Sequence, residues 1–471
     1  MRRPHTASTG SESPPARPNI LLITTDQQHH RLAGYAGDRY VCTPALDRLA
    51  REGTRFELTY AANPVCVPSR YSLLTGHLPH RFGGLETNQQ SNGPPLPAIA
   101  DWVSTPTTGH CLRAAGYDTV YGGKLHVEGI PAFTPEAERR FGFRCLTGDS
   151  REELALRSRD FLLQRGREPA SAPGPFFLWA SFINPHDICH VLPRGADRPS
   201  FEPATLDESP PLPDNFAPTR GEPRWISGFR DGTLGNESTL ELGLTRRFGR
   251  SARSWSERQW RLYRGLYRHH MAAVDRQIGI VLDALRESGL QRDTVVIFTS
   301  DHGDHDGEHR LTMKRSFYEA AAHVPLLVRW PGHVPAGRVD DRHLVNNGID
   351  LLPTLCDLAG AAPPAGLPGR SFAGLAQADP ASAWPEFTVS ETVGGRMLRS
   401  ARYKYCVYHH AGVSEELLCD LHDDPLENDN LAASPPHRAT LHEHRHLLAD
   451  WTRRHHDPGG TAYLAALPGD Q

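Results

Sequence analysis

Residues 19–26 read NILLITTD, an unbroken run of apolar and β-branched residues that ends in a carboxylate. Such a run is typical of a strand buried on both faces of a parallel sheet. The segment TPALDRLAREG at 43–53 has helical spacing, a proline at the first helical position and a glycine stop. A strand followed by a helix indicates an α/β fold, with Asp26 at the carboxyl end of its first strand.

Three later stretches repeat this pattern. We expect strands over 117–121, 176–182 and 294–299, and a helix over 265–288 before the last of them. Each strand leads into polar residues, namely Gly122-Gly123-Lys124, Asn184-Pro185-His186 and Asp301-His302. Ligands of open α/β sheets bind outside the carboxyl ends of the strands, so we predict the functional site there.

The length of 471 residues predicts more than one domain. We expect a disordered tail over 1–17, a catalytic domain over 18–375 and a C-terminal α+β subdomain over 376–471. In the last of these, the runs EFTVSET, RMLRSARYKYCVYHH and EELLCDL predict a small antiparallel sheet, followed by a helix near 435–454. The Pro- and Gly-rich region 193–250 reads as an irregular excursion at the rim of the site.

Composition excludes several classes of protein. The net charge of -4 argues against nucleic acid or an anionic membrane as the partner. No apolar stretch follows the first arginines or reaches the length of a membrane span, so we expect a cytoplasmic protein. The eight cysteines form no CxxC pair and read mostly as buried thiols. Lysine is rare: the only three are Lys124, Lys314 and Lys404, and Lys124 and Lys314 suggest positions where the guanidinium of arginine would not serve.

Two polar pairs follow predicted strands and suggest a metal site: Asp26 with Gln27, and Asp301 with His302. Oxygen-rich sets of this kind suit a hard divalent cation such as Ca²⁺, Mg²⁺ or Mn²⁺. An aspartate after a strand is also a common helix cap, so these pairs alone leave both interpretations open. The run DHGDHDGEH lacks the spacing of an EF-hand calcium loop.

An ordered series of motifs resembles the sulfatase family of the alkaline phosphatase superfamily. The series is TTDQQ at 24–28, CVPSRYSLLTGHLP at 66–79, GGKLH at 122–126, NPHD at 184–187 and SDHGDHDGEH at 300–309. The resemblance implies a large domain with a mainly parallel sheet flanked by helices, and a smaller C-terminal domain with an antiparallel sheet. It also implies hydrolysis of sulfate monoesters to an alcohol and inorganic sulfate.

In that family the signature cysteine is oxidised to formylglycine by a separate generating enzyme, so the resemblance implies this modification at Cys66. It implies one divalent metal ion, with Ca²⁺ the first choice and Mn²⁺ or Mg²⁺ as alternatives. The metal-ligand positions are Asp26, Gln27, Cys66, Asp301 and His302. The catalytic positions are Cys66, Arg70, Lys124, His126, His186 and Lys314. Among them, His126 matches the base that helps release sulfate, and His186 with Lys314 matches the pair that binds sulfate and protonates the leaving group.

Two departures from the family pattern bear on the metal and the substrate. Many sulfatases have aspartate where this chain has Gln27, and asparagine where it has His302. One fewer formal charge favours a softer ion such as Mn²⁺.

The substrate stays open between choline-type, aryl and carbohydrate sulfates. One rival function is a phosphonate monoester or phosphodiester hydrolase with the same site, and another is an unmodified pseudoenzyme that only binds ligands. The oligomeric state also stays open.

Overall fold

The computed structural model of the protein describes residues 17–82, 104–127, 134–148, 151–169, 174–191, 209–234, 251–379 and 383–468. The predicted tail up to residue 16 lies outside these ranges, as do residues 192–208 and 235–250 of the predicted excursion. Within 209–234 the structure has a short helix, α8 (Arg224–Asp231). Across the described residues, no helix combines the length and apolar character needed to cross a bilayer.

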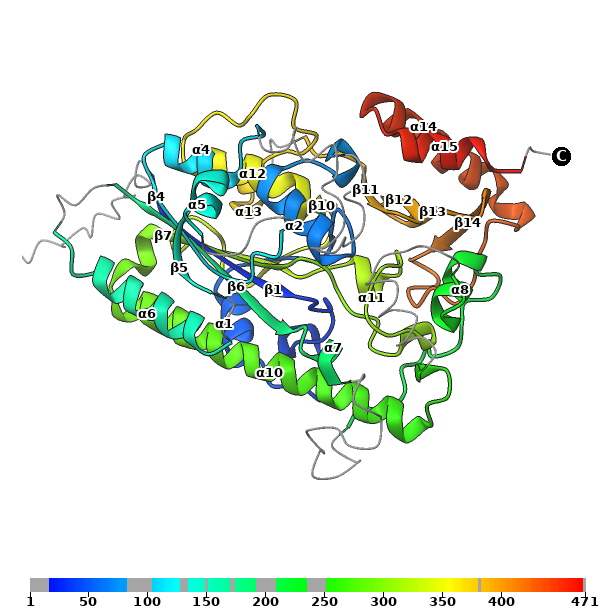
Figure 1. Cartoon of the computed structure of the whole chain (residues 1–471), viewed down its shortest axis with the longest axis horizontal. Helices are drawn as coiled ribbons and strands as arrows, with labels where there is room; N and C mark the ends of the chain where they lie inside the picture. The colour runs from blue at the N-terminus through cyan, green and yellow to red at the C-terminus, as the bar shows by residue number, and fades with distance from the viewer. Residues whose placement is uncertain are drawn as a thin grey trace, which may run out of the picture.

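An eight-stranded sheet forms the centre of the larger part of the described structure (Figure 1). From edge to edge its strands are β5 (Arg144–Thr147), β4 (Asp118–Gly123), β6 (Phe176–Pro185), β1 (Asn19–Asp26), β7 (Thr294–Ser300), β8 (Leu326–Arg329), β2 (Thr54–Phe56) and β9 (Arg338–Asp340). All neighbours pair in parallel except β8, which is antiparallel to β7 and to β2. This confirms the predicted mainly parallel sheet.

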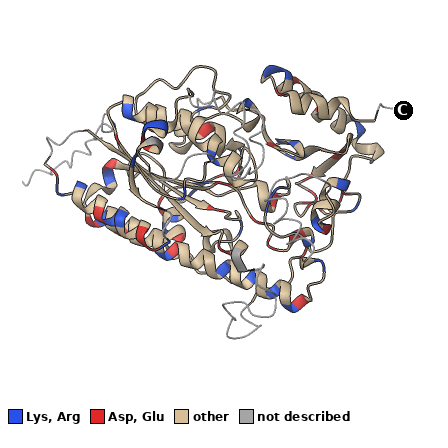
Figure 2. Cartoon of the chain, viewed as in Figure 1, with Lys and Arg blue, Asp and Glu red and all other residues tan. Residues whose placement is uncertain are grey.

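Helices cover both faces of this sheet (Figure 1). One face packs against α1 (Pro44–Glu52), α6 (Glu153–Arg165) and α10 (Glu257–Glu287). The other face packs against α2 (Cys66–Thr75), α4 (Thr108–Ala114), α5 (Pro135–Phe141), α12 (Asn347–Leu358) and α13 (Ala373–Ala376). The central strand β1 alternates between the two cores: Ile20 and Leu22 enter one, and Leu21 and Ile23 the other. Residues of both charge signs are spread along α6 and α10 (Figure 2).

The long helix α10 begins eight residues before the predicted start at Gly265. Its first turn is closed by a capping box, in which Ser256 Oγ accepts from Gln259 N and Gln259 Oε1 accepts from Ser256 N at 2.8 Å. The extra turns bury Trp260 and Tyr263 beneath the polar end of the sheet. The prediction missed these turns because arginines separate their apolar residues.

The C-terminal part contains the predicted antiparallel sheet, of strands β11 (Phe387–Thr392), β12 (Gly395–Ser400), β13 (Tyr403–His410) and β14 (Val413–Asp420). Helices α14 (Arg438–Arg454) and α15 (Pro458–Ala465) pack on one of its faces, and α8 packs on the other. The helix near 435–454 is confirmed, whereas α15 was not predicted. The exact boundary at 375/376 stays a prediction.

A buried charge cluster ties this C-terminal part to the larger sheet. His80, beyond the end of α2, contacts Glu391 of β11: its backbone N lies 2.7 Å from Oε1, and its Nδ1 lies 2.9 Å from Oε2. The other ring nitrogen, Nε2, lies 3.1 Å from the carbonyl oxygen of His455. A carboxylate and a carbonyl only accept hydrogen bonds, so both nitrogens donate and the ring is charged. Burial opposes this charge, but Glu391 outweighs it and raises the pKa of His80 to about 9.

The raised pKa predicts a pH-dependent stability. The stabilising contribution of His80 is fully present below about pH 6.5 and is lost as the pH rises through about 9. For wild-type protein the loss should reach up to about 3 kcal/mol. We expect His80→Gln to lower the free energy of unfolding strongly at pH 6 and only weakly at pH 9.5, as measured by urea unfolding. His422→Gln, at an exposed histidine, is the control; an equal loss at both pH values for His80→Gln would contradict this assignment.

Candidate active site

The polar ends of β1 and β7 meet because the two strands are parallel neighbours, with Thr25 opposite Ser300. The next residues, Asp26 and Asp301, therefore lie side by side and fully buried. Asp301 Oδ1 accepts hydrogen bonds from the backbone N of Gln27 at 3.0 Å and of His302 at 2.9 Å. The structure thus brings together the two polar pairs that were predicted as metal ligands.

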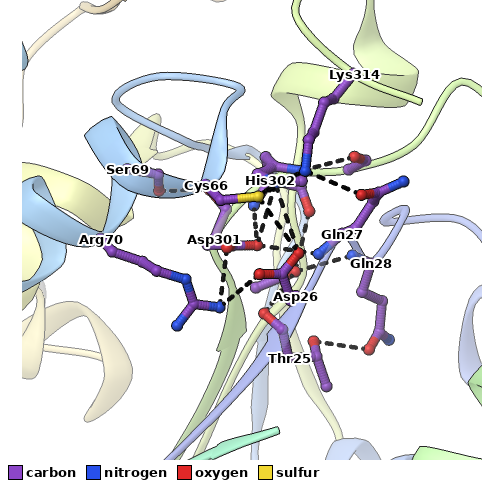
Figure 3. Close-up of polar contacts among 12 residues, drawn as sticks. Thr25, Asp26, Gln27, Gln28, Cys66, Ser69, Arg70, Asp301, His302 and Lys314 are labelled. Carbon is purple, nitrogen blue, oxygen red and sulfur yellow. Dashed lines mark hydrogen bonds and ion pairs between the residues drawn. The ribbon is translucent and has the colours of Figure 1, made fainter. Parts of the chain in front are cut away.

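Cys66 enters this cluster from the amino terminus of α2 (Figure 3). It is the first residue of this helix. Its Sγ lies 3.2 Å from His302 Nε2 and 3.7 Å from Asp26 Oδ1. Ser69, one turn on, donates from Oγ to the carbonyl oxygen of Asp301 at 2.6 Å and so fixes α2 to the end of β7.

Arg70 and Lys124 neutralise the two carboxylates. Arg70 Nη2 lies 2.8 Å from Asp26 Oδ2 and 3.0 Å from Asp301 Oδ2. Lys124 Nζ lies 2.8 Å from Asp26 Oδ2, although β4 is separated from β1 by β6. Gly123 makes this reach possible: its φ is +94°, and a Cβ there would lie 2.0 Å from the carbonyl oxygen of Ser181.

Lys314 and His186 also contact Cys66. Lys314 Nζ lies 2.6 Å from Cys66 Sγ, 3.0 Å from Gln27 Oε1 and 3.1 Å from His302 Nε2 (Figure 3). His186, at the end of β6, makes a side-chain hydrogen bond with Cys66. Burial and the nearby Lys124 lower the pKa of His186 to about 4, so its ring is neutral at neutral pH.

His126 is the one predicted catalytic residue that the structure does not join to the cluster. Its side chain is exposed, two residues beyond Lys124, and its backbone φ is +45°. Among the contacts made by described residues, none links it to Cys66. Its assignment as a base therefore stays a prediction.

The electrostatics of the cluster favour negative charge at position 66. Burial and Asp26 oppose a thiolate, but Lys314, Lys124 and His302 outweigh them and hold the pKa of Cys66 well below its usual value. Burial also opposes the charge of Asp26, yet Lys124 and the other cations keep the pKa of that carboxyl well below its usual range. Burial and repulsion from Asp26 raise the pKa of Asp301 to about 6. The three acidic groups of the site, Cys66, Asp26 and Asp301, thus lie among three cations, Arg70, Lys124 and Lys314.

The donor set fits a divalent cation. One ligand atom from each of Asp26, Cys66, Asp301 and His302 lies within 4.8 Å of the others. His302 Nδ1 lies 2.8 Å from the carbonyl oxygen of Gly303, so it donates there, and Nε2 is the ring nitrogen that faces the cluster. The ammonium of Lys314 contacts two members of this set, Cys66 Sγ and His302 Nε2, and also Gln27 Oε1.

Three residues around Gln27 were missed by the sequence reasoning. Gln27 Nε2 donates to Asp304 Oδ2 at 2.6 Å, and Tyr263 Oη donates to Asp304 Oδ1 at 3.0 Å. Cys189 Sγ lies 3.4 Å from Gln27 Oε1, although this cysteine was read only as a packing residue. The one available signal was the second aspartate in the run SDHGD.

A cluster of carboxylates and cations lies at the carboxyl edge of a mainly parallel sheet, and an antiparallel C-terminal sheet follows, as expected from the resemblance to hydrolases of the alkaline phosphatase superfamily. The sulfatase family matches residues 18–361, and the C-terminal family of N-sulphoglucosamine sulphohydrolase matches residues 307–453. The chain therefore belongs to the sulfatase family, and it is a sulfuric ester hydrolase.

Individual relatives agree with this family. The chain is 32% identical to a Delta 4,5-hexuronate-2-O-sulfatase of Bacteroides thetaiotaomicron, over 94% of this chain and 90% of the relative. It is similar in structure to a 2-O GAG sulfatase, with a TM-score of 0.76 and 29% identity over 94% of this chain and 93% of the other. A phosphonate monoester hydrolase of Agrobacterium radiobacter shares the fold, with a TM-score of 0.69 and 23% identity over 93% and 96% of the two chains.

Proposed function

We propose that this sulfatase hydrolyses sulfate monoesters with formylglycine, made from Cys66 by a separate generating enzyme, and one divalent cation. The observation that carries the proposal is that Cys66 Sγ lies close to ligand atoms of Asp26, Asp301 and His302 and 2.6 Å from Lys314 Nζ, while Lys124 Nζ contacts Asp26. Asp26, Gln27, Asp301 and His302, with residue 66, would hold the cation.

The cation supplies positive charge beside residue 66, and formylglycine supplies a hydrated aldehyde with two hydroxyl groups. The other steps fall to side chains of this chain. Arg70 contacts both Asp26 and Asp301, and it fixes the orientation of their carboxylates. Lys124, Lys314 and His186 offer donors to the sulfate oxygens and to the leaving alcohol. The exposed His126 would take the proton whose removal from the second hydroxyl releases sulfate.

The ion in this chain is proposed to be Ca²⁺, with Mn²⁺ or Mg²⁺ as alternatives. Asp26 and Asp301 offer the hard oxygen ligands that Ca²⁺ and Mg²⁺ prefer. Gln27 and His302 replace charged or oxygen donors by a neutral amide and an imidazole, which supports Mn²⁺. Competition between the three ions for binding to the matured protein distinguishes them.

The proposed substrate class is a sugar that carries the sulfate ester on a uronate. The support is the name of the hexuronate-2-O-sulfatase that this chain resembles over most of both lengths, together with the 2-O GAG sulfatase structure. The phosphonate monoester hydrolase is more distant and supports the fold alone. A cytoplasmic location stays a prediction.

The test begins with peptide mass spectrometry of position 66 on protein that has been co-produced with a formylglycine-generating enzyme. A metal-replete panel then compares an unsaturated uronate 2-O-sulfate disaccharide, an aryl sulfate and a phenylphosphonate monoester. We expect formylglycine at position 66 and the highest kcat/KM on the uronate sulfate. An active protein with an unmodified thiol would overturn the formylglycine proposal, and a preference for the phosphonate would overturn the substrate class.

A further inference from the structure

The backbone of Gln27 is fixed at the edge of the proposed cation site. The residue has a φ of +73° and is fully buried. Its backbone N donates to Asp301 Oδ1, and its carbonyl oxygen accepts from Tyr267 Oη. The contacts of the side chain then decide which end of its terminal amide, the oxygen or the NH₂ group, faces the cation.

The two ends of an amide are almost equal in size but opposite in chemistry, so its hydrogen-bond partners decide which end faces a cation. Asp304 Oδ2, at 2.6 Å, is an acceptor and requires the NH₂ group. The amide oxygen must then point the other way, where it lies 3.0 Å from Lys314 Nζ (Figure 3). With the opposite orientation, Gln27 would present N–H groups to the cation.

Asp304 is itself fixed. It is fully buried, and Tyr263 Oη of α10 lies 3.0 Å from Oδ1 and 3.2 Å from Oδ2. The backbone N of Asp306 donates to Oδ1 at 2.7 Å. Oδ1 is thus taken by a backbone donor, and Oδ2 is the oxygen that faces Gln27.

We propose that Asp304 is a positioning residue that aims the amide oxygen of Gln27 at the cation. This inference rests on the proposed role of Gln27 as a metal ligand. A carboxylate at position 27 would have an oxygen at either end and would need no such support. The chain therefore uses Asp304 to make a neutral amide act as a ligand.

The variant Asp304→Asn tests this because the geometry fixes how the new amide must sit. Asp306 N keeps an oxygen at the Oδ1 place, so the new NH₂ group takes the place of Oδ2 and faces Gln27. Two NH₂ groups cannot hydrogen-bond each other, so the new amide favours a Gln27 oxygen turned toward position 304, against the contacts of that oxygen with Lys314 Nζ and Cys189 Sγ. We expect the Kd for Ca²⁺ or Mn²⁺, measured by calorimetry on matured protein, to rise about 10- to 100-fold.

The exchange variant Gln27→Glu with Asp304→Asn separates positioning from a merely structural role. It keeps the net charge, and the carboxylate at 27 accepts from the amide at 304 while its other oxygen faces the cation. We expect it to bind the cation at least tenfold more tightly than Asp304→Asn alone. Asp350→Asn, at a buried carboxylate in α12 that accepts from the backbone N of Asn346 and of Arg370, is the matched control and should leave the Kd unchanged. Peptide mass spectrometry checks that position 66 is equally modified in every protein.

The outcomes are distinguishable. Wild-type affinity in Asp304→Asn, or no recovery in the exchange variant, would overturn the role of Asp304 while the wild-type protein still binds the cation. If matured wild-type protein binds none of the three cations, the proposed metal-dependent function fails, and this inference fails with it.

Discussion

Replacement of Cys66 by alanine is expected to lower kcat/KM for the sulfate ester by about 10³-fold or more, because it removes the proposed nucleophile from the centre of the cluster. Cys66→Ser should fail differently. Serine offers a single hydroxyl, so a serine that has taken up the sulfuryl group has no second hydroxyl that could release it. We expect Cys66→Ala to remain unlabelled and Cys66→Ser to accumulate a stable sulfate ester, which intact-protein mass spectrometry would detect.

Both variants should fold, because Cys66 is small and its Sγ is surrounded by polar groups. Circular dichroism and thermal melts control for this. Turnover by Cys66→Ala within about tenfold of the wild type would show that residue 66 is not the nucleophile.

Replacement of Lys404 by methionine is expected to destabilise the folded protein by about 3–5 kcal/mol. Lys404, on β13, is fully buried and its Nζ lies 2.9 Å from Glu319 Oε1, 2.5 Å from Glu427 Oε1 and 2.7 Å from the carbonyl oxygen of Phe317. Without the ammonium, two buried carboxylates face each other. Burial already raises the pKa of Glu427 to about 7, so one of the two must take up a proton.

Urea unfolding at pH 7.5 measures this loss. The double variant Lys404→Met with Glu427→Gln removes one of the two carboxylates and should recover part of the stability. A loss of unfolding free energy below about 1 kcal/mol in Lys404→Met would contradict this prediction, because it would mean that other groups compensate the charges of Glu319 and Glu427.

The central strands were predictable because burial on both faces leaves a continuous apolar run, as in NILLITT and TVVIFTS. The helix α15 was not predictable, because its sequence PGGTAYLA contains two glycines, which disfavour a helix. Its first turn is stabilised instead by Asp457, whose side chain accepts a hydrogen bond from Gly460 N. The antiparallel direction of β8 likewise depends on long-range pairing with β7 and β2. No local pattern encodes it.

The members of the site were predictable to the extent that they occupy strand ends or match family motifs. The rarity of lysine was informative, because Lys124, Lys314 and Lys404 are all buried and in contact with carboxylates or with Cys66. Asp304 could not be assigned a role from sequence. Its partner Gln27 lies 277 residues away along the chain, and only the pairing of β1 with β7 brings the two together.

Every residue of α2, from Cys66 to Thr75, is buried. The helix lies against α12, where a Cβ on Gly348 would meet Ala62 and Ser72 at 2.5 and 2.8 Å. An oxidising enzyme that must bind the residues around Cys66 cannot reach them in the folded protein. Under the proposed chemistry, the oxidation of Cys66 therefore has to take place on the nascent or unfolded chain. A molecule that folds before this oxidation keeps its thiol.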